Sequence, residues 1–291
     1  MFLTSIIFLA VLSALVLAHE FGHFFTARRF GVKAEEFGLG FPQRLGGIYK
    51  NSAGKWKLVL GNKNVEDAPG TVYSVNWIPL GGFVKLNEDE SQSDDSSHFI
   101  NKKIWQRAII LSAGVFMNLV LAAVIFSIGL AIGMPQALDS VGPRAEVTGR
   151  NIQVIQVFPE SPALRAGVQI GDIIESINWQ KFSSYQELQK FVDEHSGEKL
   201  SYDIKRGGES LTEGITPEKM SDSGKGGIGV GIIETGIVKY PFYIAIWQGV
   251  KITALYTWVI ITAFYELLKS IIVGDGVSGD LAGPVGIATM T

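Results

Sequence analysis

Residues 1–18 constrain this chain most, because they contain no charged side chain and lead directly into the run His19-Glu-Phe-Gly-His23. As an α-helix, the stretch from Phe2 to about Phe25 is long enough to cross a hydrocarbon core of roughly 30 Å. Ionisable groups beside hydrocarbon are costly and are usually functional. We therefore interpret residues 1–27 as a first transmembrane helix with a functional site near its end.

His19 and His23 stand four residues apart, so a helix points both imidazoles at one metal ion from the same face. Glu20 lies beside them as a candidate general base. The chemistry needs these residue types. Neutral imidazoles bind Zn²⁺, the ion lowers the pKa of a bound water towards 7, and a carboxylate takes the proton as the water attacks a carbonyl. The pattern predicts a zinc hydrolase, and the alternative is a chance cluster at a helix end.

The composition indicates membrane spans together with a soluble module, because 47% of the residues are hydrophobic and only 18% are charged. The net charge of −3 gives no case for nucleic-acid binding. The chain has no cysteine, which excludes disulfides and thiolate metal ligands. A signal peptide cleaved after Ala18 is an alternative to the first span, but no Lys or Arg precedes the apolar run.

Basic residues flank the segment between the first apolar run and the second. They are Arg28, Arg29, Lys33, Lys102, Lys103 and Arg107. The positive-inside rule assigns residues 28–107 to the cytoplasm and the N-terminus to the outside. The metal site then lies near the cytoplasmic face of the membrane.

Residues 72–86 contain two short β-prone runs around Pro79-Leu-Gly-Gly82, which predicts a membrane-associated β-hairpin. Such a hairpin beside the metal site either offers a strand edge to an extended substrate or only packs against the helices. Residues 87–97 are acidic and serine-rich, and we interpret them as a linker. The earlier run Gly38-Leu-Gly-Phe41 is interpreted as a loop.

Residues 108–134 carry no charge and predict a second transmembrane helix. Asn118 is the one strongly polar residue of this run, and Ser112 and Gly114 lie close to it in sequence. That face is expected to pack on another helix or on the active site. The second span runs from inside to outside, so the segment after it lies outside the cytoplasm.

Residues 145–236 have the pattern of an α+β module, with β-prone runs at 152–158 and 173–177. Ser184 and Glu187 form a capping box that predicts the start of a helix. Because apolar segments lie on both sides, the module is expected to be inserted into a multi-pass α-helical membrane protein.

Residues 240–273 are apolar and aromatic, but Lys251, Glu266 and Lys269 interrupt them. The uncharged part between Lys251 and Glu266 is too short to cross a membrane alone. We favour a helix that lies at the outer interface, with a third span as the alternative. Residues 274–291 are expected to lead into a further span.

Several stretches of this chain occur together, in the same order, in one protein family. They are His19-Glu-Phe-Gly-His23, Phe37-Gly-Leu-Gly-Phe-Pro42, Pro79-Leu-Gly-Gly-Phe-Val-Lys85, Trp105-x-Arg107, Ser112-Ala-Gly-x-x-x-Asn118 and Ser161-Pro-Ala-x-x-Ala-Gly-x-x-x-Gly-Asp172. The last resembles the PDZ domains of bacterial membrane and envelope proteases. Over essentially its whole length the chain resembles the bacterial site-2 protease family, in its regulator of sigma-E protease branch. It departs at Val115, where the family usually has proline, and at Asn178-Trp179, where Asn-Gly is common.

The resemblance implies an intramembrane zinc metalloprotease of the bacterial inner membrane, with its N-terminus and PDZ-like module outside the cytoplasm. His19 and His23 map to zinc ligands, and Glu20 maps to the catalytic carboxylate. The family's third zinc ligand is an aspartate in a Leu-Asp-Gly motif, which is absent here, because Ser140 follows Leu138-Asp139.

Residues 278–288 resemble the stretch just before the span that carries this aspartate. We therefore expect the sequence to be truncated, with the third ligand beyond residue 291. Catalytic zinc sites normally use three protein ligands, so a chain with two histidines alone is expected to be inactive.

The same resemblance implies the substrate class and the partners. The segment 79–85 maps to a membrane-associated β-loop that engages substrate, which makes Gly81, Gly82 and Phe83 candidates for substrate binding. Asn118 is a further candidate. The substrate is expected to be a single-span membrane protein, such as an anti-sigma factor or a remnant signal peptide, that an upstream site-1 protease has shortened. The lipid bilayer is the other expected partner, and the PDZ-like module is expected to act as a size filter.

Two other functions fit parts of the sequence. A membrane-anchored PDZ-like module without catalysis would bind peptides through residues 145–236 and would not need the histidines. A secreted zinc peptidase would have His19 as its mature N-terminus.

Overall fold

The structure is a computed structural model of the chain. It describes every residue except 1, 64, 66–67, 87–96, 220–224 and 274–291. The chain forms two compact units, which are Met1–Ile125 with Val250–Thr291, and Phe126–Gly249. The predicted lead-in at 274–291 lies outside the described residues. The predicted linker at 87–97 also lies outside them, except for residue 97.

Among the described residues, three helices are long and apolar enough to cross a membrane. They are α1 (Phe2–Arg29), α2 (Ile104–Ile132) and α5 (Phe242–Val273). Apolar side chains cover α1 and α2 on all sides, which is typical of helices that are not half-exposed to water. The predicted spans 1–27 and 108–134 coincide with α1 and α2 to within four residues at each end.

Helix α5 is continuous over 32 residues. It contains Lys251, Glu266 and Lys269, and the last two form an ion pair at 3.5 Å. At 1.5 Å per residue such a helix is about 48 Å long, more than the roughly 30 Å of a hydrocarbon core. Its length meets the requirement of the third-span alternative, and its placement at the interface or across the membrane stays a prediction.

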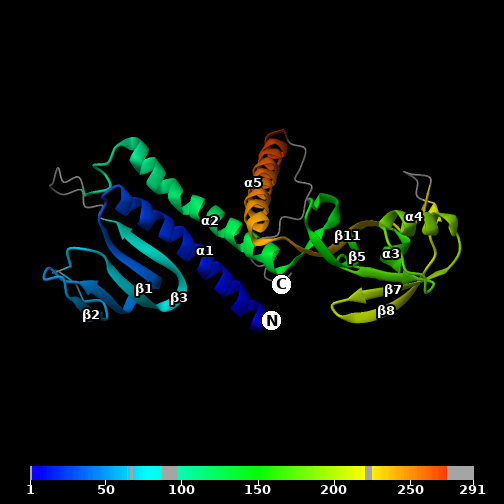
Figure 1. Ribbon diagram of the computed structural model, residues 1–291, viewed down its shortest axis with the longest axis horizontal. Helices are drawn as coiled ribbons and strands as arrows, with labels where there is room; N and C mark the ends of the chain where they lie inside the picture. Colours follow the sequence, from blue (N-terminus) through cyan, green and yellow to red (C-terminus); the bar gives the residue numbers. More distant parts are fainter. Residues whose placement is uncertain (1, 64, 66–67, 87–96, 220–224, 274–291) are drawn as a thin grey trace. The chain divides into compact units, whose positions relative to one another are not determined.

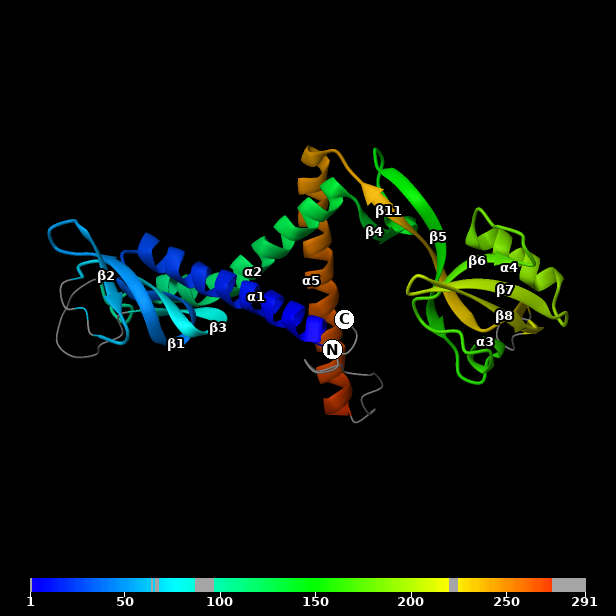
Figure 2. The same ribbon diagram turned by 90° about the horizontal axis from the view of Figure 1, so that it is seen from below.

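Helices α1 and α2 pack closely and antiparallel (Figures 1 and 2). Gly22 lies opposite Ala113, and a β-carbon on Gly22 would overlap the Ala113 carbonyl oxygen. Further along α1, Ala27 shares a small buried cluster with Ile110 and with Val32. Small residues at such a contact let helix backbones approach closely. This contact brings α2 against the face of α1 that carries the histidines.

A three-stranded sheet, in the order β2-β1-β3, packs on α1. Its strands are β1 (Ala34–Lys50), β2 (Trp56–Leu60) and β3 (Val72–Leu86). Strand β1 pairs antiparallel with both neighbours, and its residues 36–39 each have two partners on β3, one near each end. Phe37, for example, lies opposite both Tyr73 and Val84.

The predicted hairpin over residues 72–86 is therefore wrong. The two arms of this segment do not pair with each other, because residues 36–39 of β1 lie between them. Gly38-Leu-Gly-Phe41, expected to be a loop, belongs to β1.

The glycines of β3 explain this difference, because they serve close packing on α1 instead of a chain reversal. A β-carbon on Gly81 would lie 2.6 Å from Cγ1 of Val16. One on Gly82 would lie 2.9 Å from the carbonyl oxygen of Gly38 and 3.0 Å from Cδ1 of Leu17. A side chain at either position would require neighbouring atoms to move, so the glycines set how closely β3 approaches the helix.

The second unit is built on a six-stranded sheet in the order β4-β11-β5-β6-β7-β8. Its strands are β4 (Met134–Ala137), β5 (Glu146–Val157), β6 (Ile173–Ile177), β7 (Leu200–Arg206), β8 (Glu209–Ile215) and β11 (Val230–Lys239). Shorter elements complete it: η1 (Leu138–Ser140), α3 (Pro162–Arg165), α4 (Tyr185–Glu194), β9 (Glu218–Lys219) and β10 (Gly226–Gly227). The predicted bounds 145–236 leave out β4, which pairs with the end of β11.

Helix α4 closes the core of this sheet. The Ser184 hydroxyl accepts the Glu187 N–H, which is one half of the predicted capping box. Leu188 and Val192 of α4 are buried against Ile177 and Leu200 of the sheet. A helix with one apolar stripe on a sheet face is the expected way to bury both elements from water.

An ion pair joins β7 to the loop before β6. Arg206 donates from Nε and Nη2 to the two carboxylate oxygens of Asp172, each at 2.7 Å, and the Gln169 N–H donates to the same carboxylate. Burial of the Asp172 carboxyl raises its pKa, but the hydrogen bonds from Arg206 and Gln169 outweigh this effect, so the pKa lies below its usual range. The ionised form is therefore the one that the fold stabilises.

The turn after β6 keeps a tight geometry despite its unusual sequence. Asn178 and Trp179 both have positive φ, at 48° and 68°, which a two-residue type I′ turn requires at both positions. The Trp179 side chain is 87% exposed, so no packing against the unit holds it in this conformation. Trp179 thus replaces the common glycine, and the backbone conformation of the turn stays that of type I′.

Candidate metal centre and active site

The two histidines of α1 meet at their Nε2 atoms. These atoms are 3.1 Å apart, and the rings meet edge to face. Two nitrogens bound at 2.0–2.1 Å to one tetrahedral Zn²⁺ would lie about 3.3 Å apart. The arrangement of His19 and His23 therefore fits a single metal ion held by both rings.

A backbone carbonyl of α2 orients the second imidazole. Nδ1 of His23 lies 2.8 Å from the carbonyl oxygen of Ile110, which can only accept a hydrogen bond. The ring proton is therefore assigned to Nδ1, which leaves the lone pair on Nε2. A carbonyl that fixes the tautomer in this way is a common support for metal-binding histidines.

Gly114 of α2 leaves the space in front of both imidazoles open. A β-carbon at this position would lie 2.5 Å from Nε2 of His23 and 2.6 Å from Nε2 of His19. Any side chain would therefore press on the two atoms that would bind a metal. The glycine thus keeps free the space beside the two Nε2 atoms that a side chain would fill.

Glu20 projects to the other neighbour of α1, the strand β3. Its Oε2 accepts the backbone N–H of Val84 at 3.2 Å. This bond holds the carboxylate on β3 and leaves its other oxygen for proton transfer. It also ties the candidate base to a strand of the sheet.

The metal-binding side chains that the described residues supply fit zinc. Two neutral imidazoles with a nearby carboxylate that is not a ligand make up the protein side of many catalytic zinc sites, together with a third ligand. Within the described residues no group of three or more His, Cys, Asp and Glu side chains gathers around a common point. His19 and His23 are thus the two ligands that the described residues offer.

The predicted substrate-binding residues of β3 lie beside α1. Gly81 and Gly82 are buried, and both face α1. The Phe83 ring covers Gly38 of β1, where a β-carbon would overlap it. The structure gives these three residues a packing role, and their contact with substrate stays a prediction.

Asn118 lies one helical turn beyond Gly114 and therefore on the same face of α2. Its Oδ1 is buried and accepts no hydrogen bond from the described residues. A buried, unpaired amide oxygen costs about 1–3 kcal/mol unless it finds a donor. Asn118 is thus poised to bind a donor, in keeping with its predicted role.

Three contributors to this site are not predicted from the sequence above. One is Gly114, although a glycine within an apolar span signals a close approach. The carbonyl of Ile110 and the N–H of Val84 are backbone groups, so no residue type could have revealed them.

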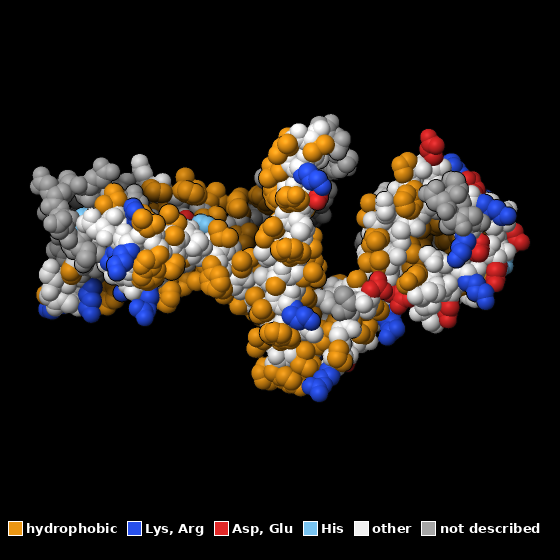
Figure 3. Space-filling model, turned by 90° about the horizontal axis from the view of Figure 1, so that it is seen from above, with side chains coloured by type: hydrophobic (Ala, Val, Ile, Leu, Met, Phe, Trp, Pro, Cys, Tyr) orange, Lys and Arg blue, Asp and Glu red, His pale blue; other side chains and the backbone are white. Residues whose placement is uncertain are grey.

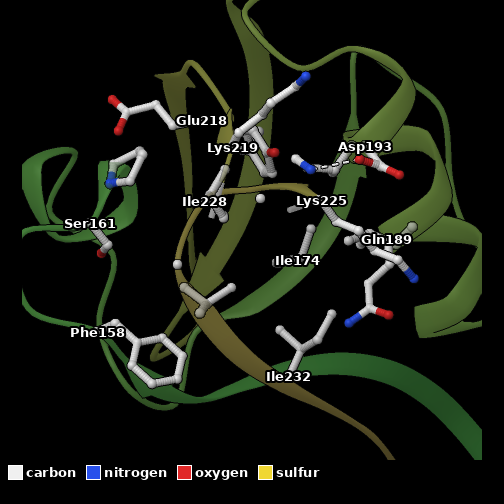
Figure 4. A pocket seen from close by; sticks show the side chains of 18 of the residues that line it. Phe158, Ser161, Ile174, Gln189, Asp193, Glu218, Lys219, Lys225, Ile228 and Ile232 are labelled. Carbon is white, nitrogen blue, oxygen red and sulfur yellow. Dashed lines mark hydrogen bonds between the residues drawn. The ribbon is translucent and has the colours of Figure 1, made fainter. Parts of the chain in front are cut away.

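A second candidate site is a cavity of about 1010 Å³ in the second unit. Figure 4 shows Ile174, Ile228 and Ile232 lining it between α4 and the segment with Phe158 and Ser161. Further lining residues are charged or polar: Glu160, Gln186, Gln189, Lys190, Asp193, Glu218, Lys219 and Lys225. The run Gly227-Ile-Gly229 also lines the cavity.

Strand β11 presents an edge next to this cavity. β5 pairs with one side of β11 over residues 230–239. β4 pairs with the other side only over residues 235–238. Among the described residues no strand covers that second side at residues 230–234, and Val230 and Ile232 line the cavity there.

Comparison with known protein families shows to which family this chain belongs. The sequence model of peptidase family M50 matches residues 7–291. The chain belongs to this family. M50 is the site-2 protease family, so the resemblance seen in the sequence is confirmed, and family members are embedded in membranes.

Several relatives resemble the chain over nearly its whole length. A candidate zinc metalloprotease of Clostridium perfringens is 32% identical over 284 residues, covering 97% of this chain and 73% of that protein. A similarly named protein of Clostridium acetobutylicum is 31% identical, covering all of this chain and 74% of that protein. The protease RseP of Yersinia pestis is 25% identical, covering 97% of this chain and 79% of its own length.

Among solved structures, the PDZ domain of an SdrC-like protein from Listeria monocytogenes is similar to part of the chain. It is 25% identical, with a TM-score of 0.28, and the match covers 30% of this chain and 92% of that domain.

Proposed function

We propose that this M50 peptidase is an intramembrane zinc endopeptidase that cleaves single-span membrane proteins. The observation that carries the proposal is the pair of Nε2 atoms 3.1 Å apart on a helix that is apolar enough to span a membrane. Relatives named as zinc metalloproteases and as the protease RseP support both the metal and the reaction. The substrates we propose are anti-sigma factors or remnant signal peptides, cut during regulated intramembrane proteolysis.

Nε2 of His19 and Nε2 of His23 would hold the zinc ion, together with a further ligand. When bound, zinc polarises a peptide carbonyl and lowers the pKa of a water molecule towards 7. Glu20 accepts the proton of the attacking water on the carboxylate oxygen that Val84 leaves free. As the peptide C–N bond breaks, Glu20 returns this proton to the leaving amine nitrogen, so the carboxylate ends in its starting state.

Strand β3 is the proposed substrate platform. The Val84 N–H points away from β1 and towards Glu20, and backbone groups two residues apart point to the same edge. Gly82 and Leu86 therefore share this outward edge with Val84. An unwound substrate segment that adds to this edge would bring its peptide bonds next to Glu20. Asn118, with its unpaired Oδ1, would accept an N–H of the same segment.

The basic residues at both ends of residues 28–107 favour a cytoplasmic position for the sheet and an outside position for the N-terminus, in a bacterial inner membrane. The second unit then lies outside the cytoplasm. In this position it would act as a size filter that admits only substrates already shortened by a site-1 protease. The 1010 Å³ cavity and the adjacent edge of β11 are where it would contact them.

The test is the substitution Glu20→Gln in the full-length protein, reconstituted in lipid nanodiscs with a labelled remnant signal peptide. We expect cleavage to fall by about 100- to 10,000-fold, the range for loss of a general base. The zinc content is expected to stay unchanged, since Glu20 is not a ligand. The matched control is Glu35→Gln, which changes a carboxylate paired with Lys85. Cleavage retained in Glu20→Gln would overturn the assignment.

A second candidate function is peptide binding without catalysis, which the cavity of the second unit favours. An extended peptide could add to the free edge of β11 and place apolar side chains against Ile174, Ile228 and Ile232. If this is the only function, replacing His19 and His23 by alanine leaves every activity of the protein unchanged. A proteolytic function predicts loss of both zinc and cleavage in the same variant.

A further inference from the structure

Strand β2 carries apolar side chains that no other described part of the first unit covers. Trp56, Leu58 and Leu60 are 61%, 68% and 62% exposed, and Ile48 of β1, opposite Leu58, is 47% exposed. On the opposite face of β2, Val59 is buried and Lys57 is exposed. The segment from Ile48 to Leu60, here called the β1–β2 hairpin, therefore has an open apolar stripe on one face and covered apolar residues on the other.

The covered face of the hairpin has a partner within the unit. Tyr49, Val59 and Val72 form a buried cluster there, with Val65 and Ala68 packed against it. A strand that is apolar on both faces is expected between two apolar layers. The structure provides one of these layers, so the open face requires another apolar medium or partner.

The register of the sheet shows which other residues share the open face. Ile48 lies opposite Leu58 on one side and Tyr73 on the other, and Tyr73 lies opposite Phe37. Directly opposed residues of a sheet project from the same face. The rings of Phe37 and Tyr73 contact Phe24 of α1, at 4.8 and 6.1 Å between centroids. The open stripe thus continues the same sheet face that the spanning helix α1 covers.

The contacts of the sheet with α1 also order the stripe by depth. At one end of the strands, Gly82 packs on Leu17, in the apolar part of α1. At the other end, the Tyr73 hydroxyl accepts a hydrogen bond from Arg28 in the last turn of α1. Leu60 lies in the same row of cross-strand partners as Gly82, because successive partners across the sheet are Leu60, Gly46, Val75, Leu39 and Gly82. Leu60 therefore belongs to the deep end. The row with Trp56 lies beyond that of Tyr73.

The shallow end of the hairpin is suited to the membrane surface. Trp56 lies opposite Lys50, and Lys55 precedes it at the end of the turn, with both lysines exposed. Tryptophan is enriched where hydrocarbon meets headgroups, and lysine extends its ammonium group to the surface from apolar surroundings. Arg28 and Arg29 end α1 on the same side. The charge at this end is positive, which complements anionic headgroups.

We propose that the β1–β2 hairpin is a lipid anchor that lays Ile48, Leu58 and Leu60 into the hydrocarbon and binds anionic phospholipid headgroups through Lys50 and Lys55. This inference rests on the membrane setting in the proposed function, but not on catalysis. The anchor holds the outer strand of the sheet at a fixed depth. It thereby fixes the level at which the other end of the sheet, with Val84, meets Glu20.

The absence of cysteine allows a direct test with single nitroxide labels in the intact protein in bilayers. Labels at Leu58→Cys and Leu60→Cys are expected to collide with oxygen and to be shielded from a water-soluble nickel complex. Leu60 is expected to be the deeper of the two. The matched control is Lys57→Cys, whose exposed side chain lies on the opposite face of β2 and should meet the nickel complex.

Two results would overturn the anchor. Exposure of the Leu58 label to nickel, equal to that at Lys57, would place the stripe in water. Shielding of the Leu58 label from both reagents would show that protein covers it, either a second copy or another segment. A further label at Leu12→Cys of α1 separates the proposals, because nickel exposure there as well would remove the membrane setting itself.

The headgroup contact is tested with Lys50→Gln combined with Lys55→Gln. In the unchanged protein, anionic phospholipid added to zwitterionic bilayers should move the Leu58 label deeper. Each lysine near an anionic surface contributes about fivefold to binding, so the double variant should lose about 25-fold in the ratio of inserted to free hairpin. Lys181→Gln with Lys190→Gln, in the second unit, is the control. An equal response to anionic lipid in both variants would remove the role of Lys50 and Lys55.

Discussion

The second unit encloses one core, whereas the first unit leaves most of its apolar side chains exposed. Thirteen buried residues form a single cluster between the six-stranded sheet and its helices in the second unit. In the first unit, buried clusters are small, and large apolar residues along α1, α2 and β2 are exposed. Figure 3 shows the same contrast, with charged side chains scattered over the second unit and hydrophobic ones gathered over the helices.

This difference teaches that two physical effects build the molecule. The second unit is held by removal of apolar surface from water, which is roughly proportional to buried area. The first unit relies on close backbone contact at glycines, as at Gly22, Gly81 and Gly114, while its outer surface suits lipid. The candidate metal centre lies in the first unit, where a methyl group added at one of these glycines would displace neighbouring atoms.

The largest effect is expected for Gly114→Ala in the first unit. The new methyl group would press on Nε2 of both His19 and His23, so we expect zinc affinity and cleavage to fall by at least about 10- to 100-fold. Zinc content and cleavage rate are the measurements, and Val115→Ala, at an exposed neighbour, is the control. Wild-type zinc affinity in Gly114→Ala would break the link between close packing and the site.

In the second unit, truncation of a core side chain should act on stability alone. Leu200 is 1% exposed within the core, so Leu200→Ala should destabilise the unit by about 2–5 kcal/mol. Hydrogen exchange of the amides of β6 and β7, measured by mass spectrometry in the intact protein, reports this loss. The zinc content should not change. A loss of zinc in Leu200→Ala would show that the two units are not energetically separate.

A smaller and pH-dependent effect is expected for Asp172→Asn. The pKa of Asp172 is lowered in the folded state, so its ionised form contributes stability above the unfolded pKa of about 4. That contribution is lost as the pH falls through the folded pKa. At neutral pH the variant should lose about 2 kcal/mol in protection of β6 and β7, and the difference should vanish in acid. A difference that stays constant down to pH 2 would contradict the role of ionised Asp172.

The smallest effect is expected for Tyr202→Phe, and its sign is opposite. The Tyr202 hydroxyl is buried, and no described residue forms a hydrogen bond with it. Burial also raises its pKa well above the usual range, as expected for a phenol held away from water. Removing the unpaired hydroxyl should stabilise the second unit by about 1 kcal/mol, visible as slower amide exchange. Destabilisation would mean that the hydroxyl has a partner in solution.

The sequence predicted those features that repeat along a helix or precede a cap. The spacing of His19 and His23, the uncharged runs of α1 and α2, and Ser184 before α4 all depend on neighbouring residues. The sheet of the first unit could not be predicted in this way. Its strand β1 reads as a loop at Gly38-Leu-Gly-Phe41, because glycines chosen for close packing also signal turns.

The candidate site likewise has parts that the sequence predicts and parts that it does not. The two imidazoles and the carboxylate are visible as residue types, but their supports are backbone groups of Ile110 and Val84 from distant segments. Only the fold brings these groups to α1. The open space at Gly114 is equally a property of the packed helices and not of the glycine alone.

The most direct test of the central claim is X-ray absorption at the zinc edge of the full-length protein, with the metal content of the purified protein measured in parallel. The account predicts about one zinc per chain, with imidazole nitrogens at about 2.0–2.1 Å. In a variant with His19→Ala and His23→Ala together, the imidazole signal and the zinc should be lost. Stoichiometric zinc with an unchanged spectrum in that double variant would show that α1 does not hold the metal.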